Sequence, residues 1–594
     1  MSQSARILPW LLLVVIALAP LFMEGTYFRY LGIIVFIYGI VAVGLNILAG
    51  YAGQFSLGHA ALMAMGAYTT ALLSKALAPV PLFAATGLHI WLGVVLGTCV
   101  AAGFGALLAF PALRVRGPYL AMVTIAFGWV IFKILQEWVS VTGGDLGLAS
   151  IPKAQIGAWQ LGTREYYYVV LALFTLALVL QRRIVKSPFG MRLRAMKHSE
   201  IGLASVGINV YRLKVKVFIV SAAFAGFGGA LFAHQQNYVS PDNFQFFSSV
   251  FFLLAILFGG AGTLSGPVIG ATVLTLLPEL LHDFDTYRLI VYGSFILLTL
   301  YFLPSGVMGI FHRRQGSIAT PIDANVLQHA PQEMAATRGA SLELRSISRA
   351  FGGVKAVNEA SFKVEAGSIH ALIGPNGAGK TTIINIITGF YQPSSGEILL
   401  DGAAFRTGSL DAAARLGIAR TFQTIKLFGA MTVLEHVLVG FSSRSSAGLW
   451  SALLSGGRVR AEEDGHLKTA RELIRFVGLG GYEDVPANTL AYGHRRLLEI
   501  ARALAVKPRC LLLDEPAAGL VAGEIQALGG VIRRLKSTGM TIVLVEHHMD
   551  LVVRVSDSIT VVDYGSVIAQ GSPAEVQRDA RVIEAYLGPS HVAT

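Results

Sequence analysis

Long apolar runs occupy the first half of the chain, whereas short apolar runs alternate with polar loops in the second half. A helix crosses a bilayer with roughly 20 apolar residues, because hydrocarbon cannot satisfy open backbone groups. Ten runs have about this length: 7–23, 30–49, 51–73, 89–111, 118–136, 165–181, 215–236, 247–262, 264–281 and 287–303. The short runs at 247–262 and 264–281 indicate a broken or re-entrant pair. The pattern predicts an all-α membrane domain over 1–314, with about ten transmembrane helices.

Composition and charge agree with this division. Of the 594 residues, 14% are charged, against about 25% in average soluble domains. Residues 1–315 carry 20 Lys or Arg and 9 Asp or Glu, whereas residues 316–594 carry 27 and 26. With the N-terminus inside, cytoplasmic segments hold 14 basic residues and outer loops hold 5, so the positive-inside rule puts both termini in the cytoplasm. Basic residues between apolar spans are typical of membrane topology rather than of nucleic-acid binding.

Three features of the membrane half each have two interpretations. Residues 6–19 fit a cleaved signal peptide or a retained signal anchor, and the nine later spans favour the anchor. Residues 190–206, in a basic segment, fit a helix on anionic lipid or a coupling helix docked on an ATPase. The Gly-containing turns 52–56 and 261–265 resemble each other, and close helix packing explains them more simply than a transport site does.

Residues 315–340 have no strong period and few charges, which predicts a flexible linker before a soluble domain at 341–594. There a buried strand at 368–373 precedes a glycine-rich loop and an apolar helix, which together form the GxxxxGK[ST] phosphate-binding pattern. The loop's backbone N–H groups cradle phosphate oxygens, Lys380 reaches the β- and γ-phosphates, and the Thr381 hydroxyl binds Mg²⁺. The predicted nucleotide-binding residues here are Gly374, Pro375, Asn376, Gly377, Ala378, Gly379, Lys380, Thr381 and Thr382.

A second apolar strand, at 510–513, ends in Asp514 and Glu515. Behind a phosphate loop, one carboxylate in this position holds Mg²⁺ and the next polarises the attacking water. The sequence therefore predicts an ATP hydrolase that uses ATP and Mg²⁺.

Between the phosphate loop and the Asp514–Glu515 pair lies the segment Leu490, Ala491, Tyr492, Gly493, His494. It is similar to the signature of ABC-transporter ATPases, usually Leu-Ser-Gly-Gly-Gln, and residues 342–590 resemble that family. The resemblance implies an α/β P-loop fold with a helical subdomain. It also implies that Gln423 in ARTFQTIKLF is the Q-loop glutamine and a metal contact, and that His547 in LVEHHMD contacts the γ-phosphate. Phe351 in RAFGGVKAV resembles the aromatic residue that stacks on adenine.

The ATPase half contains GIARTFQTIKLFGAMTVLEHVLVG, LAYG before RRLLEIARAL, and the tail EAYLG. The membrane half contains GLNILAGYAGQFSLGHAALM, RVRGPYLAMVTIAFG, TGGDLGL, SPFGMRLRAM with GINVYRLK, and GGAGTLSGPVIGA. These segments resemble the ATPase and the permease, respectively, of one system, the branched-chain amino acid ABC importers. The resemblance implies a fused permease and ATPase in a bacterial inner membrane, with the ATPase cytoplasmic. It implies a second permease subunit, a second ATPase subunit and a periplasmic solute-binding protein as partners.

Several residues depart from the family pattern. Tyr492 replaces a signature glycine, His494 replaces glutamine, and Val521 lies where Asn-Pro usually follows AGL. His548 follows the switch histidine where Asp is common, and Trp129 stands where the permease pattern often has Glu. The departures at the signature and at Val521 concern contacts between two ATPase domains.

Alternatives remain for the cargo, the class and the assembly. The same scaffold would serve urea, short amides or an aromatic acid, and a membrane-tethered regulatory ATPase would move no solute. An exporter is disfavoured by the matched permease segments. One chain carries one phosphate loop and one signature, so a homodimer and a heteromer are both possible, and the resemblance favours the heteromer.

Overall fold

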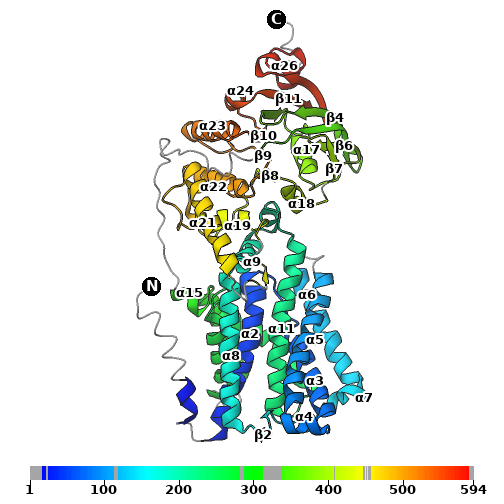
Figure 1. Ribbon diagram of the computed structural model, residues 1–594, viewed down its shortest axis with the longest axis vertical. Helices are drawn as coiled ribbons and strands as arrows, with labels where there is room; N and C mark the ends of the chain where they lie inside the picture. The colour runs from blue at the N-terminus through cyan, green and yellow to red at the C-terminus, as the bar shows by residue number, and fades with distance from the viewer. Residues whose placement is uncertain are drawn as a thin grey trace. The chain divides into compact units, whose positions relative to one another are not determined.

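The computed structural model describes residues 16–21, 25–112, 118–280, 287–311, 338–406, 408–445, 448–449, 451 and 457–587 (Figure 1). The chain divides into two compact units. The first comprises Met1–Leu193 and Tyr211–Arg314, and the second comprises Arg194–Val210 and Gln315–Thr594. Residues 194–210, predicted within the membrane domain, thus belong with the second unit. Of the predicted linker, only residues 338–340 are described.

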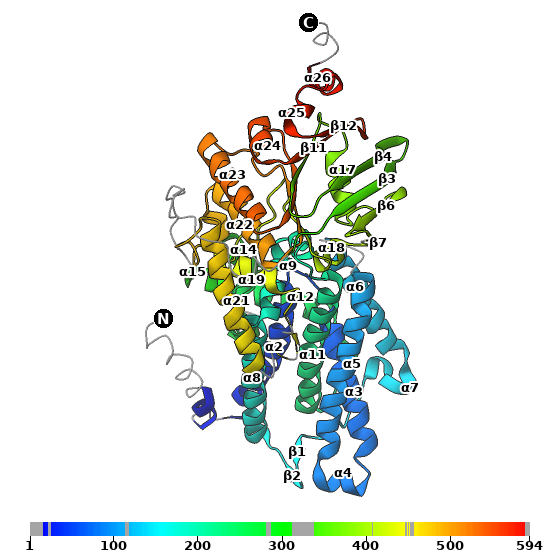
Figure 2. The same ribbon diagram turned by 45° about the horizontal axis from the view of Figure 1, so that its top comes forward.

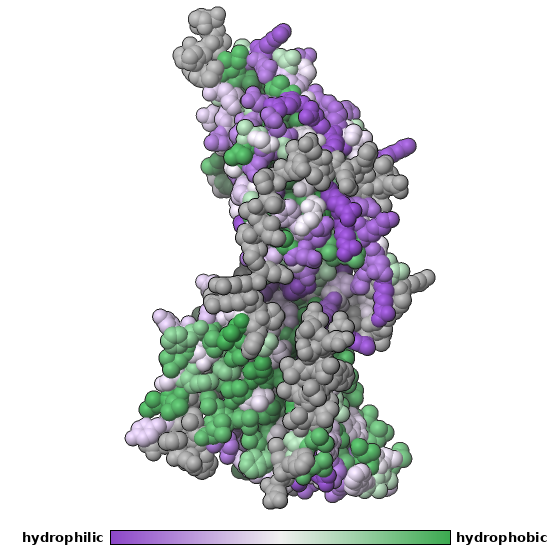
Figure 3. Space-filling view, turned by 90° about the vertical axis from the view of Figure 1, so that its left-hand side faces the viewer, coloured by the Kyte–Doolittle hydropathy of each residue, from purple (hydrophilic) through white to green (hydrophobic). Residues whose placement is uncertain are grey.

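Within its described residues, the first unit has seven helical segments long and apolar enough to cross a membrane. They are α2 (Thr26–Leu45) with η1 (Asn46–Tyr51), α3 (His59–Leu77), α5 (Leu88–Ala112), α6 (Pro118–Glu137), α8 (Thr163–Lys186), α11 (Val210–Gln236), and η3 (Pro241–Phe244) with α12 (Phe246–Gly259). Two further helices, α13 (Gly266–Leu280) and α14 (Arg288–Phe302), have 15 residues each. The predicted all-α membrane half is confirmed, and Figure 3 shows apolar side chains over much of its visible face. The predicted span 7–23 lies mostly outside the described residues.

The remaining elements of the first unit are short. They are α4 (Pro81–Thr86), α7 (Val139–Thr142), η2 (Gly144–Leu146), the antiparallel pair β1 (Gln155–Ile156) and β2 (Trp159–Gln160), and α15 (Val307–Phe311). The basic segment forms α9 (Pro188–His198) and α10 (Glu200–Ala204).

The predicted span 51–73 is wrong at its start, because residues 52–58 are irregular and α3 begins only at His59. Within this stretch, the Leu57 N–H donates to Thr124 Oγ1 at 2.9 Å and the Gly58 N–H donates to Ser56 Oγ at 3.4 Å. The buried Asn46 stabilises a different break, the one between α12 and α13: its Nδ2 donates to the Thr263 carbonyl and its Oδ1 accepts from the Gly262 N–H, each at 2.8 Å. Irregular backbone at membrane depth needs such internal partners.

The second unit contains two sheets. A six-stranded sheet has the order β12 (Ser566–Gly571), β11 (Ser558–Asp563), β5 (Ile369–Ile373), β10 (Thr541–Val545), β9 (Cys510–Asp514), β8 (Ile418–Arg420), and is parallel except for β12. A four-stranded antiparallel sheet has the order β4 (Val354–Val364), β3 (Leu342–Phe351), β6 (Ser395–Leu400), β7 (Ala403–Phe405), and Figure 2 shows β3, β4 and β6 side by side. All residues of β5 and β10 are buried, His370 and Thr541 included, because both faces of this sheet are covered.

Helices complete the second unit. They are α17 (Lys380–Ile387), α18 (Leu410–Arg415), α19 (Val433–Phe441), α21 (Gly457–Phe476), η5 (Ala487–Thr489), α22 (Tyr492–Ala505), α23 (Ala522–Ser537), α24 (Met549–Val555), α25 (Pro573–Val576) and α26 (Ala580–Leu587). One apolar core joins α19, α21 and α22 through residues that include Phe441, Phe476 and Leu498. The predicted α/β fold with a helical subdomain is confirmed.

Glycine at 66 is required by the contact between α3 and α11. A Cβ at Gly66 would lie 2.1 Å from the Gly226 carbonyl oxygen, so any side chain there meets backbone.

We expect Gly66→Leu to lower the free energy of unfolding by at least about 2 kcal/mol, because overpacked helices must separate. Thermal unfolding in detergent measures this. The control Gly103→Leu, on the exposed side of α5 with nothing within 4 Å of a new Cβ, should unfold like the unsubstituted protein.

Candidate functional site

The carboxyl ends of the parallel strands meet at one edge of the six-stranded sheet. Val545 at the end of β10 pairs with Leu372 of β5 on one side and with Asp514 of β9 on the other. Arg420 at the end of β8 pairs with Leu512. The loops after all four strands therefore converge, which is where open α/β sheets bind ligands.

The loop after β5 has the backbone of a phosphate cradle. Gly374, Gly377 and Gly379 have φ of 151°, 84° and 98°, which residues with a side chain rarely adopt. A Cβ at Gly374 would lie 1.9 Å from the Val562 carbonyl, and one at Gly379 would lie 2.3 Å from the Ala356 carbonyl. Consecutive N–H groups in such a turn, followed directly by α17, form an anion-binding concavity.

The Lys380 ammonium is held over this loop. Its Nζ donates to the carbonyls of Gly374 at 2.7 Å and Pro375 at 2.8 Å. Burial lowers the pKa of Lys380, and the nearby carboxylates of Glu515 and Asp514 oppose that shift. Thr381 and Thr382 follow in the first turn of α17.

Two predicted catalytic residues, Glu515 and His547, and the predicted metal contact Gln423 lie together, with Glu515 directly after β9. Gln423 Nε2 donates to Glu515 Oε2 at 2.9 Å, and His547 Nε2 lies 3.1 Å from Glu515 Oε1. Glu515 has φ of 47°, an uncommon value for a residue with a side chain. Such strain persists only where surrounding contacts fix it, here the N–H of Glu515 donating to the Val545 carbonyl.

Asp514 carries the predicted metal-binding carboxylate. It is buried, and its Oδ2 accepts from Arg420 Nη2 at 2.7 Å, while its Oδ1 is buried without a hydrogen-bond partner among the described residues. The unpartnered, buried Oδ1 lies beside the start of α17, which carries the Thr381 hydroxyl. Such hard oxygen donors are the ligands that Mg²⁺ prefers. The residues present fit this ion.

Sequence reasoning missed Glu546, which organises the same edge. Its buried carboxylate accepts from the N–H of Ala517 at 2.6 Å, of His547 at 2.8 Å and of His548 at 3.2 Å. Glu546 thus ties the segment after Glu515 to the segment that bears His547. The sequence indicates this residue as an acidic side chain, Glu546, directly after the largely apolar run 541–545.

Phe351 ends β3 as part of a larger aromatic surface. Its ring centroid lies 5.0 Å from that of Tyr391, and the Arg349 guanidinium lies 4.9 Å over the Phe351 ring. Sequence analysis named only Phe351. An exposed ring beside a guanidinium offers a flat surface on which a nucleotide base can stack.

The signature segment starts α22, with Leu490 buried and Ala491 preceding the helix. A Cβ at Gly493 would lie 2.3 Å from Glu524 Oε1, and the exposed Tyr492 ring packs on Gly519. His494 is buried beside the Tyr482 ring, and burial lowers its pKa.

A buried ionic network joins α22 to the loop that contains Gln423. Arg496 donates to the carbonyls of Phe422 and Gln423, each at 2.6 Å. Glu499 Oε1 accepts from the N–H of Phe422 and of Lys426, and Arg502 donates to the Lys426 carbonyl. All three side chains are at most 2% exposed, and burial raises the pKa of Glu499. Their i, i+3 spacing on α22 was visible in the sequence and was not used.

Residues 194–210 contact this loop and its surroundings. Arg194 pairs with Glu435 at 2.9 Å, and a Cβ at Gly202 would lie 3.0 Å from the Lys426 carbonyl oxygen. Asn209 Nδ2 donates to Asp411 at 3.3 Å. The Leu203 side chain is fully buried.

Comparisons with known proteins match both units. Residues 28–300 match the family "branched-chain amino acid transport system / permease component", residues 357–518 match "ABC transporter", and residues 566–588 match "branched-chain amino acid ATP-binding cassette transporter".

Three curated relatives cover the same regions. The high-affinity branched-chain amino acid transport ATP-binding protein BraF of Pseudomonas aeruginosa is 41% identical over 248 residues, which are 42% of this chain and 97% of BraF. The ATP-binding protein LivG of Escherichia coli is 41% identical over the same shares. The permease protein LivM of Salmonella typhimurium is 34% identical over 320 residues, which are 50% of this chain and 73% of LivM.

The geometry around Glu515 generates a test of its role. Glu515→Gln keeps the size and most hydrogen bonds but removes the carboxylate predicted to polarise the attacking water. We expect ATP hydrolysis by the assembled transporter to fall at least about 100-fold while ATP binding persists. Glu365→Gln, at the amino end of β5, is the control and should hydrolyse normally. Normal turnover by the Glu515 variant would remove this residue from the mechanism.

The buried Leu203 tests whether residues 194–210 transmit motion. A carboxylate in its place is buried without a partner, which is strongly unfavourable. We expect Leu203→Asp to lower uptake into vesicles at least about tenfold while ATP hydrolysis persists. Leu203→Met keeps the apolar contact and should transport normally. Uptake that survives the Asp substitution at unchanged protein levels would contradict a coupling role.

Proposed function

Because this chain belongs to the branched-chain amino acid ABC transporters and joins their permease and ATP-binding components in one polypeptide, we propose that it couples ATP hydrolysis to uptake of branched-chain amino acids. The observation that carries this proposal is the match of both units to components of one transport system, together with the meeting of Gln423, Glu515 and His547. The chain is a multi-pass membrane protein with an ATP-hydrolysing cassette. We place it in the bacterial inner membrane, with the cassette in the cytoplasm.

In the proposed cycle, the cradle at 374–379 holds the phosphates and Lys380 contacts the β- and γ-phosphates. Glu515 accepts a hydrogen bond from the attacking water and draws its proton, and His547 contacts the γ-phosphate. Phe351 supplies the stacking surface for adenine. Mg²⁺, when bound, neutralises phosphate charge, and Thr381, Asp514 and the Gln423 amide oxygen would hold it.

Coupling follows from the connections of Gln423. Its side chain contacts Glu515, whereas its backbone is fixed by Arg496 of α22. The same loop reaches residues 194–210 at Lys426. A change at the nucleotide is therefore passed to these residues through backbone contacts.

The complete transporter requires further subunits. A closed ATP site takes a phosphate loop from one cassette and a signature from another, and this chain carries one of each. We propose a heteromer with a second permease and a second ATPase, served by a periplasmic solute-binding protein. A regulatory ATPase that moves no solute would have no use for a permease unit.

Assembly is testable on the purified chain. In nanodiscs the chain alone should be largely monomeric, with little ATP hydrolysis, and should gain activity when the second permease and ATPase are co-expressed. Mass measurement and an ATPase assay check both points. A stable homodimer that hydrolyses ATP and imports solute without those subunits would overturn the heteromer.

A further inference from the structure

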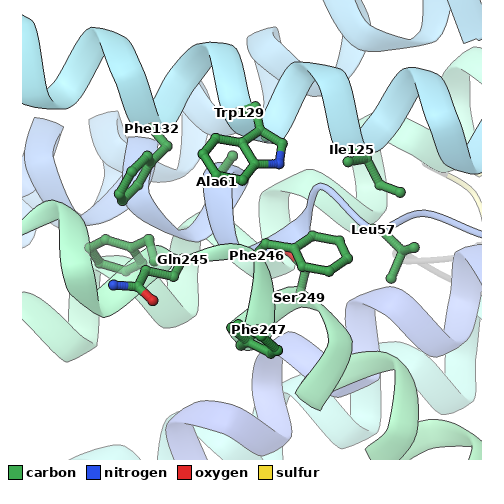
Figure 4. A pocket seen from close by; sticks show the side chains of 11 residues that line it. Leu57, Ala61, Ile125, Trp129, Phe132, Gln245, Phe246, Phe247 and Ser249 are labelled. Carbon is green, nitrogen blue, oxygen red and sulfur yellow. The ribbon is translucent and has the colours of Figure 1, made fainter.

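The first unit contains a cavity of about 450 Å³ that the ATP site does not involve. It lies between α6 and the amino-terminal ends of α3 and α12. Figure 4 shows Trp129 and Phe132 projecting from one helix toward Gln245 and Phe246 on the opposite side. Its volume is in the range of small-molecule sites.

The cavity lies where transport sites are built. Trp129 is near the middle of the 20-residue α6, whereas Phe244–Ser249 lie in the first half of the apolar segment Pro241–Gly259, so the cavity is within the membrane-spanning part of the unit. Both helices that face α6 begin there: α3 follows the irregular stretch 52–58, and α12 follows Gln245 after η3. Interrupted helices at membrane depth line cavities or pathways, because their open backbone groups need polar surroundings.

The walls combine an apolar lining with two polar groups. Five aromatic residues line the cavity, no charged residue does, and Gln245 and Ser249 are the polar side chains among the lining residues. Ser249 is 2% exposed, and its hydroxyl oxygen accepts from the Ala60 N–H at 3.0 Å, which leaves its own proton to be donated. Gln245 Nε2 donates to Asp242, which leaves its carbonyl oxygen to accept.

We propose that this cavity binds the apolar side chain of the transported amino acid, with the Ser249 hydroxyl donating to the α-carboxylate and the Gln245 carbonyl accepting from the α-ammonium. This inference rests on the proposed function and narrows it. A neutral amino acid with a branched or aromatic side chain buries apolar surface here. Urea and short amides have little apolar surface to bury, so the lining disfavours them as cargo.

Gly128 allows the cavity to be filled without disturbing the backbone. A Cβ at this position has no atom closer than 3.9 Å, so a side chain enters the cavity freely. Gly103 of α5 is the matched control, because it is exposed and a Cβ there meets nothing within 4 Å. The pair adds the same bulk to a membrane helix inside and outside the cavity.

The experiment measures uptake of alanine, valine and leucine into proteoliposomes by the assembled transporter with its binding protein. For Gly128→Leu we expect leucine uptake to fall at least about tenfold, valine less and alanine least, because larger side chains need more of the cavity. Gly103→Leu should stay within about twofold for all three. Gly128→Ala should give a smaller shift in the same order, and decides the question if the leucine variant does not fold.

The outcomes separate this proposal from the proposed function. If the unsubstituted transporter takes up leucine and the Gly128 variants do so equally well, the cavity proposal is wrong and the function stands; a lipid acyl chain in the cavity would give that result. An equal loss for all three amino acids would also overturn it, because side-chain size would then be irrelevant. If the unsubstituted transporter takes up no apolar amino acid, both proposals fail.

Discussion

The coupling mechanism proposed for the second unit depends on the buried carboxylate of Glu499. It lies between Arg496 and Arg502, and together they hold the backbone of Phe422–Lys426 at both ends. Each of the two arginines also donates to a backbone carbonyl of this stretch, whereas Glu499 Oε2 is buried without a hydrogen-bond partner among the described residues. The helix that begins with the signature and the loop that carries Gln423 are therefore joined by several buried contacts.

The stretch Phe422–Phe428 contacts two different parts of the second unit. At one end Gln423 contacts Glu515, the residue proposed to polarise water. At the other end the Lys426 carbonyl and the Phe428 ring lie against Gly202. The Arg502 guanidinium also lies 5.0 Å over the Phe428 ring. The backbone between the two ends is bonded to α22 at Phe422, Gln423 and Lys426, which supports the proposed coupling.

Local chemistry was predictable from the sequence, and long-range pairing was not. The phosphate cradle could be recognised because its donors are consecutive residues from Gly374 onward. The all-α fold of the membrane half followed from the lengths of its apolar runs, whereas the α/β fold with a helical subdomain was implied by the resemblance of residues 342–590 to ABC ATPases. The contact of Gln423 with Glu515 and the role of Glu546 depend on strand register, which no motif contains. Similarly, α3 starts later than predicted because residues 52–58 are irregular, and the Leu57 N–H in that stretch donates to the Thr124 hydroxyl, a partner 67 residues away that no local pattern indicates.

The unusual signature residues have a structural explanation that bears on assembly. Tyr492 replaces a glycine, and its ring fits over Gly519 while its hydroxyl accepts from Arg496. His494 points into the protein, where burial favours its neutral form. Both side chains therefore stabilise their own cassette, and the surface left to face another cassette's nucleotide differs from that of the common signature. In the proposed heteromer this signature completes the ATP site of the second ATPase, so that site would contain Tyr492 and His494 where the common signature has glycine and glutamine.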